Sequence, residues 1–186
     1  MGTDKTPSPE QFWQVFAKEI SERLNCISNT KRMRLYDNDK KWTCFMKAAM
    51  KLIIDKLHYN KRDFCTEYLR IDYTICPGES PVSWDLDIAI EHENKLYLWE
   101  DELTKLLHIN CGLRVLIAYY DNKNDKDLQK IRTMIVDSIA KRKYYTDDQN
   151  WLLIFGPYFL NNDGDFVAYK LVRKEPLELT KHVILR

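Results

Sequence analysis

The clearest alternation of hydrophobic and polar residues along this chain lies over residues 84–94. The hydrophobic positions hold Leu86, Ile88 and Ile90, and the positions between and after them hold Asp87, Ala89, Glu91 and Glu93. A period of two predicts a β-strand with one buried face. The opposite face is then a column of carboxylates with one small residue inside it. Like charges on one strand face repel by roughly a few tenths of a kcal/mol per pair, so this face favours a bound cation.

Helical and strand periods alternate over the rest of the chain. Ser8 and Pro9 are typical of the start of a helix, which we predict to continue to residue 24, and residues 25–40 are polar and turn-rich. Further helices are predicted over residues 41–58, 96–110 and 127–142, and further strands over residues 67–75, 113–120, 151–155 and 166–172, with a turn at 161–164. This order predicts an α/β or α+β domain whose mixed β-sheet is flanked by helices.

Length and composition indicate one globular domain. The chain has 186 residues, of which 45% are hydrophobic, and only 5 are glycine and 6 are proline. The 29 basic and 28 acidic residues give a net charge of +1, which neither indicates nucleic-acid binding nor excludes a local basic surface. No apolar run reaches the roughly 18 residues of a membrane span, and the N-terminal residues lack the apolar core of a signal peptide. The five scattered cysteines are expected to be reduced thiols in a cytoplasmic protein, with no zinc site.

A further acidic residue precedes the carboxylate strand. In the predicted strand over residues 67–75, Asp72 faces away from the core. An equal-armed hairpin of the two strands would pair Asp72 with Asp87 and leave Glu91 about 13 Å further along. An asymmetric loop or a bulge would instead pair Asp72 with Glu91. The sequence leaves both registers open.

A surface of this kind is suited to binding a hard cation. Carboxylate oxygens suit Mg²⁺ or Mn²⁺, which bind a few carboxylates and keep several waters. An ion of this kind activates water and neutralises charge at a phosphate group. The alternative is that the acids form an ordinary solvated strand face. The matching Asp72 on the preceding strand favours the metal site.

With these residues in place, the chain resembles the PD-(D/E)xK nuclease superfamily. Asp72 matches the motif aspartate, and Glu91-His92-Glu93 matches the (D/E)-x-K segment. There are two departures from the motif, because Ile71 replaces the proline before Asp72 and Glu93 stands at the lysine position. The resemblance implies a restriction endonuclease-like core over residues 41–120, within a single domain over residues 1–186. A helical extension over residues 1–40 would precede this core, and a helix and strands over residues 121–186 would follow it.

The resemblance also implies roles for particular residues. One or two Mg²⁺ or Mn²⁺ ions would be held by a set of carboxylates, Asp72, Glu91, Glu93 and Asp87. Glu93 would in addition orient the attacking water. Lys105, on the helix that follows, would replace the missing lysine and stabilise developing negative charge. Glu67 is the first choice for an upstream acid, and Glu19 and Glu22 are alternatives.

The implied activity is metal-dependent hydrolysis of phosphodiester bonds in nucleic acid, as a DNA endonuclease of restriction, defence or DNA processing that acts as a homodimer. The alternative is a catalytically inactive nuclease-fold module that binds protein or nucleic acid, and Glu93 in the lysine position favours it. Basic clusters such as residues 31–34 and 141–143 would bind the phosphate backbone if they flank the acidic face. His92 lies on the opposite strand face by parity and is expected to be structural.

Overall fold

The computed structural model of the chain describes residues 6–76, 86–95, 98–121, 126–141, 150–158, 166–172 and 175–178. Three helices come first, α1 (Pro9–Asn25), α2 (Asn29–Tyr36) and α3 (Asp39–Lys56). A short 3-10 turn (Lys61–Asp63) and three strands follow, β1 (Phe64–Tyr68), β2 (Ile71–Ile75) and β3 (Leu86–His92). The remaining elements are α4 (Trp99–His108), β4 (Cys111–Tyr120), α5 (Asp127–Ala140), β5 (Asn150–Pro157), β6 (Val167–Val172) and β7 (Glu175–Glu178).

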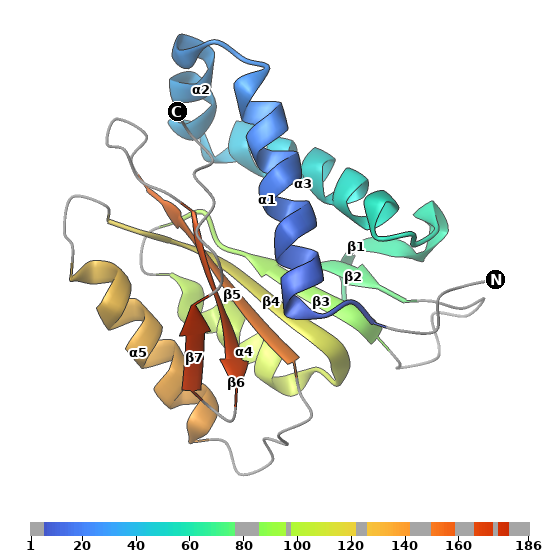
Figure 1. Cartoon of the computed structure of the whole chain (residues 1–186), viewed down its shortest axis with the longest axis vertical. Coiled ribbons are helices and arrows are strands. Elements are labelled where there is room, and N and C mark those ends of the chain that lie inside the picture. The colour runs from blue at the N-terminus through green and yellow to red at the C-terminus, as the bar shows by residue number, and fades with distance from the viewer. Residues whose placement is uncertain are drawn as a thin grey trace.

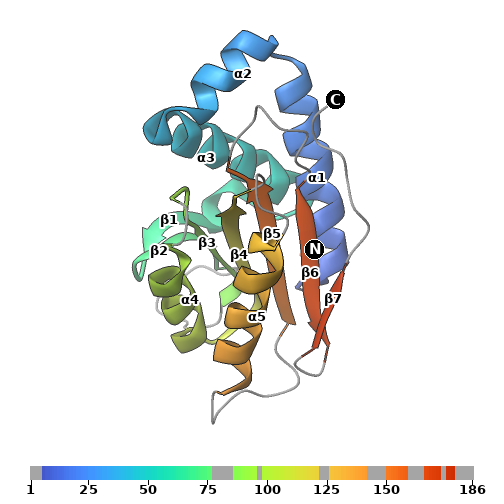
Figure 2. The ribbon, with the colours of Figure 1, turned by 90° about the vertical axis from the view of Figure 1, so that its left-hand side faces the viewer.

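The strands of the described residues form one mixed sheet in chain order, from β1 at one edge to β7 at the other (Figure 1). The first three strands are antiparallel, β3, β4 and β5 are parallel, and β6 and β7 return antiparallel. Helices α1 and α3 cover one face, while α4 and α5, which connect the parallel strands, cover the other (Figure 2). The predicted mixed sheet flanked by helices is therefore confirmed. The nearly continuous apolar strand, β4, lies in the middle of it.

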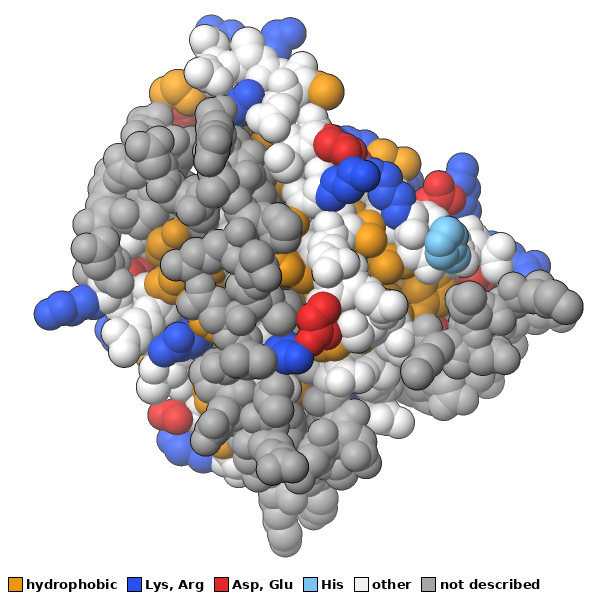
Figure 3. All heavy atoms as spheres, viewed as in Figure 1, with side chains coloured by type: hydrophobic (Ala, Val, Ile, Leu, Met, Phe, Trp, Pro, Cys, Tyr) orange, Lys and Arg blue, Asp and Glu red, His pale blue; other side chains and the backbone are white. Residues whose placement is uncertain are grey.

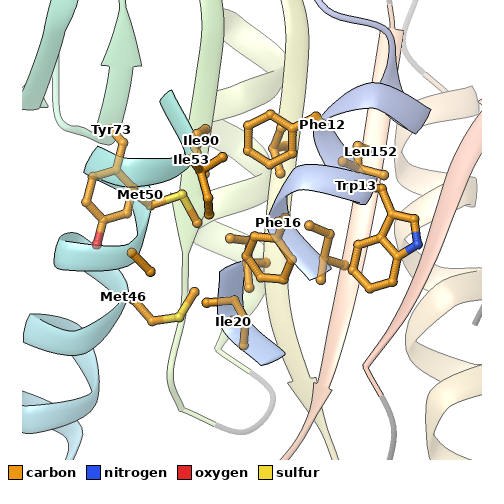
Figure 4. Packing of buried hydrophobic residues seen from close by; sticks show 14 of the residues in the cluster. Phe12, Trp13, Phe16, Ile20, Met46, Met50, Ile53, Tyr73, Ile90 and Leu152 are labelled. Carbon is orange, nitrogen blue, oxygen red and sulfur yellow. The ribbon is translucent and has the colours of Figure 1, made fainter. Parts of the chain in front are cut away.

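Aromatic residues of α1 contribute to the larger core cluster, which lies between the sheet and the two helices α1 and α3. Figure 4 shows Phe12, Trp13 and Phe16 pointing from α1 toward the strands, with methionines of α3 beside them. Ser8 caps this helix as predicted, since its side chain accepts a hydrogen bond from the backbone N–H of Gln11 at 3.2 Å. The first helix and the strands thus bury one common core, and the division of the chain at residues 40 and 120 stays a prediction.

Three local predictions were wrong or incomplete. The single strand predicted over residues 67–75 is two strands, β1 and β2, joined by a tight turn at Leu69 and Arg70. Helix α2 lies in a segment that looked only polar, because none of its residues is buried and it has no apolar stripe to reveal it. Strand β7 was not predicted. The predicted turn at residues 161–164 lies outside the described residues.

No helix in the described part of the chain is long and apolar enough to cross a lipid bilayer. The five cysteines are free thiols, in agreement with the absence of paired cysteine motifs.

The turn between β1 and β2 provides a first prediction. Leu69 and Arg70 have φ values of 53° and 66°, so both backbones are left-handed, as in a type I′ hairpin. A side chain in this region costs roughly 1 kcal/mol per residue, which Asn and Gly avoid. The double substitution Leu69→Asn/Arg70→Gly should therefore raise the free energy of unfolding in urea by about 1–2 kcal/mol. The control Leu69→Ala/Arg70→Ala removes the same side chains but keeps both Cβ atoms. An equal gain from this control would show that the backbone is not the cause.

Candidate metal centre

The register of β2 and β3 brings Asp72 beside Glu91. Tyr73 pairs with Ile90 and Ile75 pairs with Ile88, which places the residue before Tyr73 opposite the residue after Ile90. The equal-armed alternative, with Asp72 opposite Asp87, does not occur. The connection between the two strands, residues 77–85, lies outside the described part. These four paired residues face the core under α1 and α3, and a slip by one residue would turn them toward α4. Leu86, expected on the same face as Ile88 and Ile90, instead joins the cluster under α4, as does Ile71 at the start of β2.

Helix α4 adds two charged residues to this pair. Its buried residues Trp99, Leu103 and Leu106 pack on the sheet, and this fixes how the helix is rotated. Glu102 and Lys105 are three residues apart and so share one side of the helix. One oxygen each of Asp72, Glu91 and Glu102 lies within 4.8 Å of the other two, so the three carboxylates converge on one point. We call these three residues the acidic triad.

Backbone hydrogen bonds hold the two strand carboxylates in place. The N–H of His92 donates to Oδ2 of Asp72 at 2.9 Å, and the N–H of Asp72 donates to Oε2 of Glu91 at 3.4 Å. The other oxygen of Glu91, Oε1, is buried and accepts no hydrogen bond from the described residues. The Nζ of Lys105 lies 3.3 Å from this oxygen and also pairs with Glu102. An ammonium group thus supplies positive charge at the triad.

Burial makes the triad electrostatically costly. Glu91 is 0% exposed, and its desolvation, a hydrogen bond with Glu102 and the charge of Asp72 raise its pKa to about 10. Desolvation likewise raises the pKa of Asp72 and that of Glu93. Burial lowers the pKa of Lys105, but its hydrogen bond to Glu102 and its attraction to Glu91 outweigh this and raise it. Burial therefore favours the protonated form of Glu91.

The other predicted acids lie at different distances from this centre. Glu93 follows β3 at the rim, where its Oε1 accepts a hydrogen bond from the N–H of Lys95 at 2.7 Å. The charges of Glu102 and Asp72 contribute to its raised pKa, so it is a neighbour of the triad. Asp87 stands four residues before Glu91 on the same strand, about 13 Å away. It accepts a hydrogen bond from the hydroxyl of Tyr59 at 2.8 Å and takes no part in the triad.

The upstream acids also lie outside the triad. Glu67 is exposed on β1, where its left-handed φ of 58° interrupts the strand. Glu19 is buried in the helical layer and pairs with Arg23 and Lys56, and Glu22 stands beside Lys56. The structure thus brings together Asp72, Glu91 and Lys105 among the residues singled out from the sequence, with Glu93 at the edge.

Glu102 is the member of the triad that the sequence analysis missed. Its position in the first turn of α4, next to Glu100 and Asp101, is an ordinary place for acidic residues, which favour helix N-termini. The available signal was its spacing of three residues from Lys105. Had Lys105 been placed against the acidic strand face, Glu102 would have followed it there.

His92 faces away from the triad, as parity predicted. Its Nε2 lies 3.0 Å from the hydroxyl of Tyr119, and this hydroxyl accepts a hydrogen bond from the indole N–H of Trp42 at 2.5 Å. Full burial lowers the pKa of His92 to about 3, so the imidazole stays neutral. The side chain therefore connects β3 to β4 and α3 within the core, while its backbone N–H positions Asp72.

Comparison with known proteins gives no relative for this chain. No protein-family model, no curated protein and no solved structure matches it. The function therefore has to be argued from the site.

Proposed function

We propose that this chain is a divalent-metal-dependent nuclease that hydrolyses phosphodiester bonds, with Mg²⁺ or Mn²⁺ held by the acidic triad. The observation that carries this proposal is the convergence of Asp72, Glu91 and Glu102 from β2, β3 and α4 to within 4.8 Å. Rigid elements rather than loops supply all three carboxylates, which favours a site with fixed geometry.

The donor set fits a hard cation. All three groups offer carboxylate oxygens, the ligands that Mg²⁺ and Mn²⁺ prefer. The buried Oε1 of Glu91 has the ammonium of Lys105 as its neighbour at 3.3 Å, and a bound ion would offer this oxygen a direct ligand bond. Three carboxylates beside one ammonium leave an excess of negative charge if all are ionised, and a divalent ion would neutralise it.

The roles of the residues follow from their positions. A divalent ion at the triad would supply Lewis-acid chemistry, neutralising charge on a phosphodiester and lowering the pKa of water. Asp72 and Glu91 would hold the ion, and Glu102 would complete the set from the helix. Lys105 would exchange its pairing with the triad for contact with a phosphate oxygen and stabilise the charge that develops there. Glu93, at the rim and with a raised pKa, would accept a proton from the attacking water.

The order of elements supports the same proposal. A helix, three antiparallel strands, a helix and a strand parallel to the third follow one another from α3 to β4. The acids come from the second and third of these strands, which is the arrangement implied by the resemblance to PD-(D/E)xK nucleases. DNA is the substrate that this resemblance favours.

A second candidate is an inactive module on the same fold, in which Lys105 permanently replaces the metal. The observation that favours it is the position of the ammonium group, 3.3 Å from Glu91 and paired with Glu102. Glu93 in the lysine position of the motif points the same way. In this case the triad would be a structural ion-pair cluster.

Metal-dependent cleavage separates the two candidates. The intact chain is incubated with supercoiled plasmid and with end-labelled single-stranded DNA and RNA, in Mg²⁺, Mn²⁺ or EDTA. We expect cleavage that EDTA abolishes. Glu102→Gln should lower the rate by at least about 100-fold, whereas Glu100→Gln, an exposed residue of the same helix, should leave it unchanged.

Calorimetry adds a readout that does not depend on choosing the right substrate. Mn²⁺ should bind saturably to the unmodified chain and to the Glu100→Gln variant but not to the Glu102→Gln variant. It should release about one proton per ion at pH 7, because Glu91 must ionise to become a ligand. Absence of both Mn²⁺ binding and cleavage would refute the nuclease proposal and leave the ion-pair cluster.

A further inference from the structure

The outer side of the helical layer carries a groove that the proposed chemistry does not use. It has a volume of about 820 Å³ and lies among α1, α2 and α3. Apolar side chains line its floor, including Ile27, Leu35, Phe45 and Leu52. Leu52 is 41% exposed, and Ile27, Leu35 and Phe45 are only partly buried against the core. The groove therefore leaves hydrophobic surface uncovered, which is a common property of binding grooves.

A second hollow extends this groove along α3. It measures about 480 Å³ and shares Arg23 and Leu52 with the first. On α3, the lining residues from Lys41 to Lys56 recur at helical spacing and so follow one side of the helix. Fifteen residues of helix rise about 22 Å. The two hollows thus form a trough that is long enough for a helix of about 15 residues.

The rim of the trough is basic. Lys31, Arg34 and Lys41 line the first hollow, and Lys51 and Lys61 line the second. None of the five forms an ion pair with an acidic residue in the described part of the chain. Figure 3 shows Lys and Arg side chains gathered where α2 lies in Figure 1, with hydrophobic atoms reaching the surface nearby.

The acidic residues of the first hollow are already neutralised. Glu19 is buried and pairs with Arg23 and Lys56, at 2.6 Å and 2.7 Å. Glu22 stands near Lys56 and Lys18. The second hollow adds one acidic residue, Asp55, beside Lys51 and Lys61. The trough therefore keeps an excess of positive charge from its rim cations.

We propose that this trough binds an amphipathic, acidic α-helix of a partner protein. The apolar floor would accept the hydrophobic stripe of that helix, and the basic rim would pair with its flanking carboxylates. Helix α2, none of whose residues is buried, would be covered on its inner side by the partner. Nucleic acid is a less suitable partner for this trough. Its phosphate backbone would pair with the basic rim but would leave the aliphatic side chains of Leu35 and Leu52 without an apolar contact.

The test uses a designed peptide and the intact chain. The peptide is a fluorescein-labelled amphipathic helix of about 15 residues, with leucines at i, i+3, i+4 and i+7 and glutamates on both flanks. Fluorescence anisotropy should show saturable binding that weakens as salt rises. A peptide with lysines in place of the glutamates should not bind. Leu52→Glu should weaken binding by at least about tenfold, and so should the triple substitution Lys31→Glu/Arg34→Glu/Lys41→Glu.

A matched control comes from the opposite face of the molecule. Met134 on α5 is 41% exposed, the same fraction as Leu52, and also lies on a helix. Met134→Glu should bind the peptide like the unmodified chain, and circular dichroism should show all variants folded. Equal effects of Leu52→Glu and Met134→Glu, or no saturable binding, would overturn the proposal. Binding of a single-stranded oligonucleotide that depends on Lys31 and Lys41 but not on Leu52, in place of the peptide, would overturn it in favour of nucleic acid.

Discussion

The substitution Glu91→Gln is expected to stabilise the metal-free protein by about 1–3 kcal/mol at pH 7 and to abolish metal binding and cleavage. The reason is the burial of Glu91, which raises the pKa of its carboxyl to about 10 in the folded state. In the unfolded chain the same carboxyl has a pKa near 4.3. Folding at pH 7 must therefore either take up a proton or bury a charge, and both are unfavourable. Glutamine has nearly the same shape and no charge to bury.

The direction in which the stability contribution of Glu91 changes with pH follows from proton binding. Between about pH 4.3 and pH 10, the folded protein holds a proton on Glu91 that the unfolded chain has lost, so the contribution of this group to stability falls as pH rises. The full penalty at pH 7 would be about 1.4 kcal/mol for each unit between 4.3 and 7. The attraction of Lys105 is already contained in the pKa of Glu91, and the smaller range above reflects the hydrogen bond with Glu102, which the substitution alters.

Urea unfolding in EDTA at pH 4 and pH 7 checks this prediction. The stability gain from Glu91→Gln should be present at pH 7 and nearly vanish at pH 4, where the unfolded chain is also mostly protonated. The exposed control Glu100→Gln should shift stability by less than about 0.5 kcal/mol at either pH. A loss of stability in Glu91→Gln at pH 7 would mean that Glu91 is ionised and paired with Lys105, as the inactive-module candidate requires.

Bound metal should make the unmodified chain more stable than the Glu91→Gln variant, the reverse of the order expected without metal. A ligand that binds only the folded state raises its stability by an amount set by its concentration and affinity. Mn²⁺ should therefore stabilise the unmodified chain and leave Glu91→Gln unaffected. A buried carboxylate without sufficient compensation is a feature that folding alone would not favour. Its presence at the convergence of three elements is the reason to consider it functional.

The sequence revealed the strand that carries Glu91 because its signal is local. Alternation over residues 86–92 is a property of neighbours in the chain, and the structure has β3 over Leu86–His92. The pairing of Asp72 with Glu91 is not local, because it depends on the connection at residues 77–85 and on which residues of β2 fill the core. The turn at Leu69 and Arg70 was hidden for a related reason. Neither residue favours a left-handed backbone, so no turn signal marks the hairpin.

In the site as well, the sequence revealed local patterns but not contacts between distant residues. Glu91 and Asp72 were found as the acids of two alternating strands, whereas Glu102 enters the triad only through the packing of α4. The buried residues Trp99, Leu103 and Leu106 determine the rotation of that helix. Their periodicity is visible in the sequence, but the strand on which they pack is not. Helical spacing could predict that Glu102 accompanies Lys105, and only the tertiary structure places both against Glu91.

The substitution Phe16→Ala is expected to lower the free energy of unfolding by about 3–5 kcal/mol, because it opens a cavity in the core that α1 shares with the sheet. Phe16 is fully buried, and its ring lies 5.8 Å from that of Trp13 and 6.2 Å from that of Phe166 at the start of β6. Rings packed from two elements leave little room for collapse into the space of a lost phenyl group.

Urea unfolding of the intact chain measures this effect, with Gln14→Ala as the control. Gln14 is exposed on the same helix, so its loss should change stability by less than about 0.5 kcal/mol. A loss below about 1 kcal/mol for Phe16→Ala would mean that α1 docks loosely, as expected of a detachable extension. A large loss would mean that α1 is an integral part of the core, because it holds the helical layer against β5 and β6.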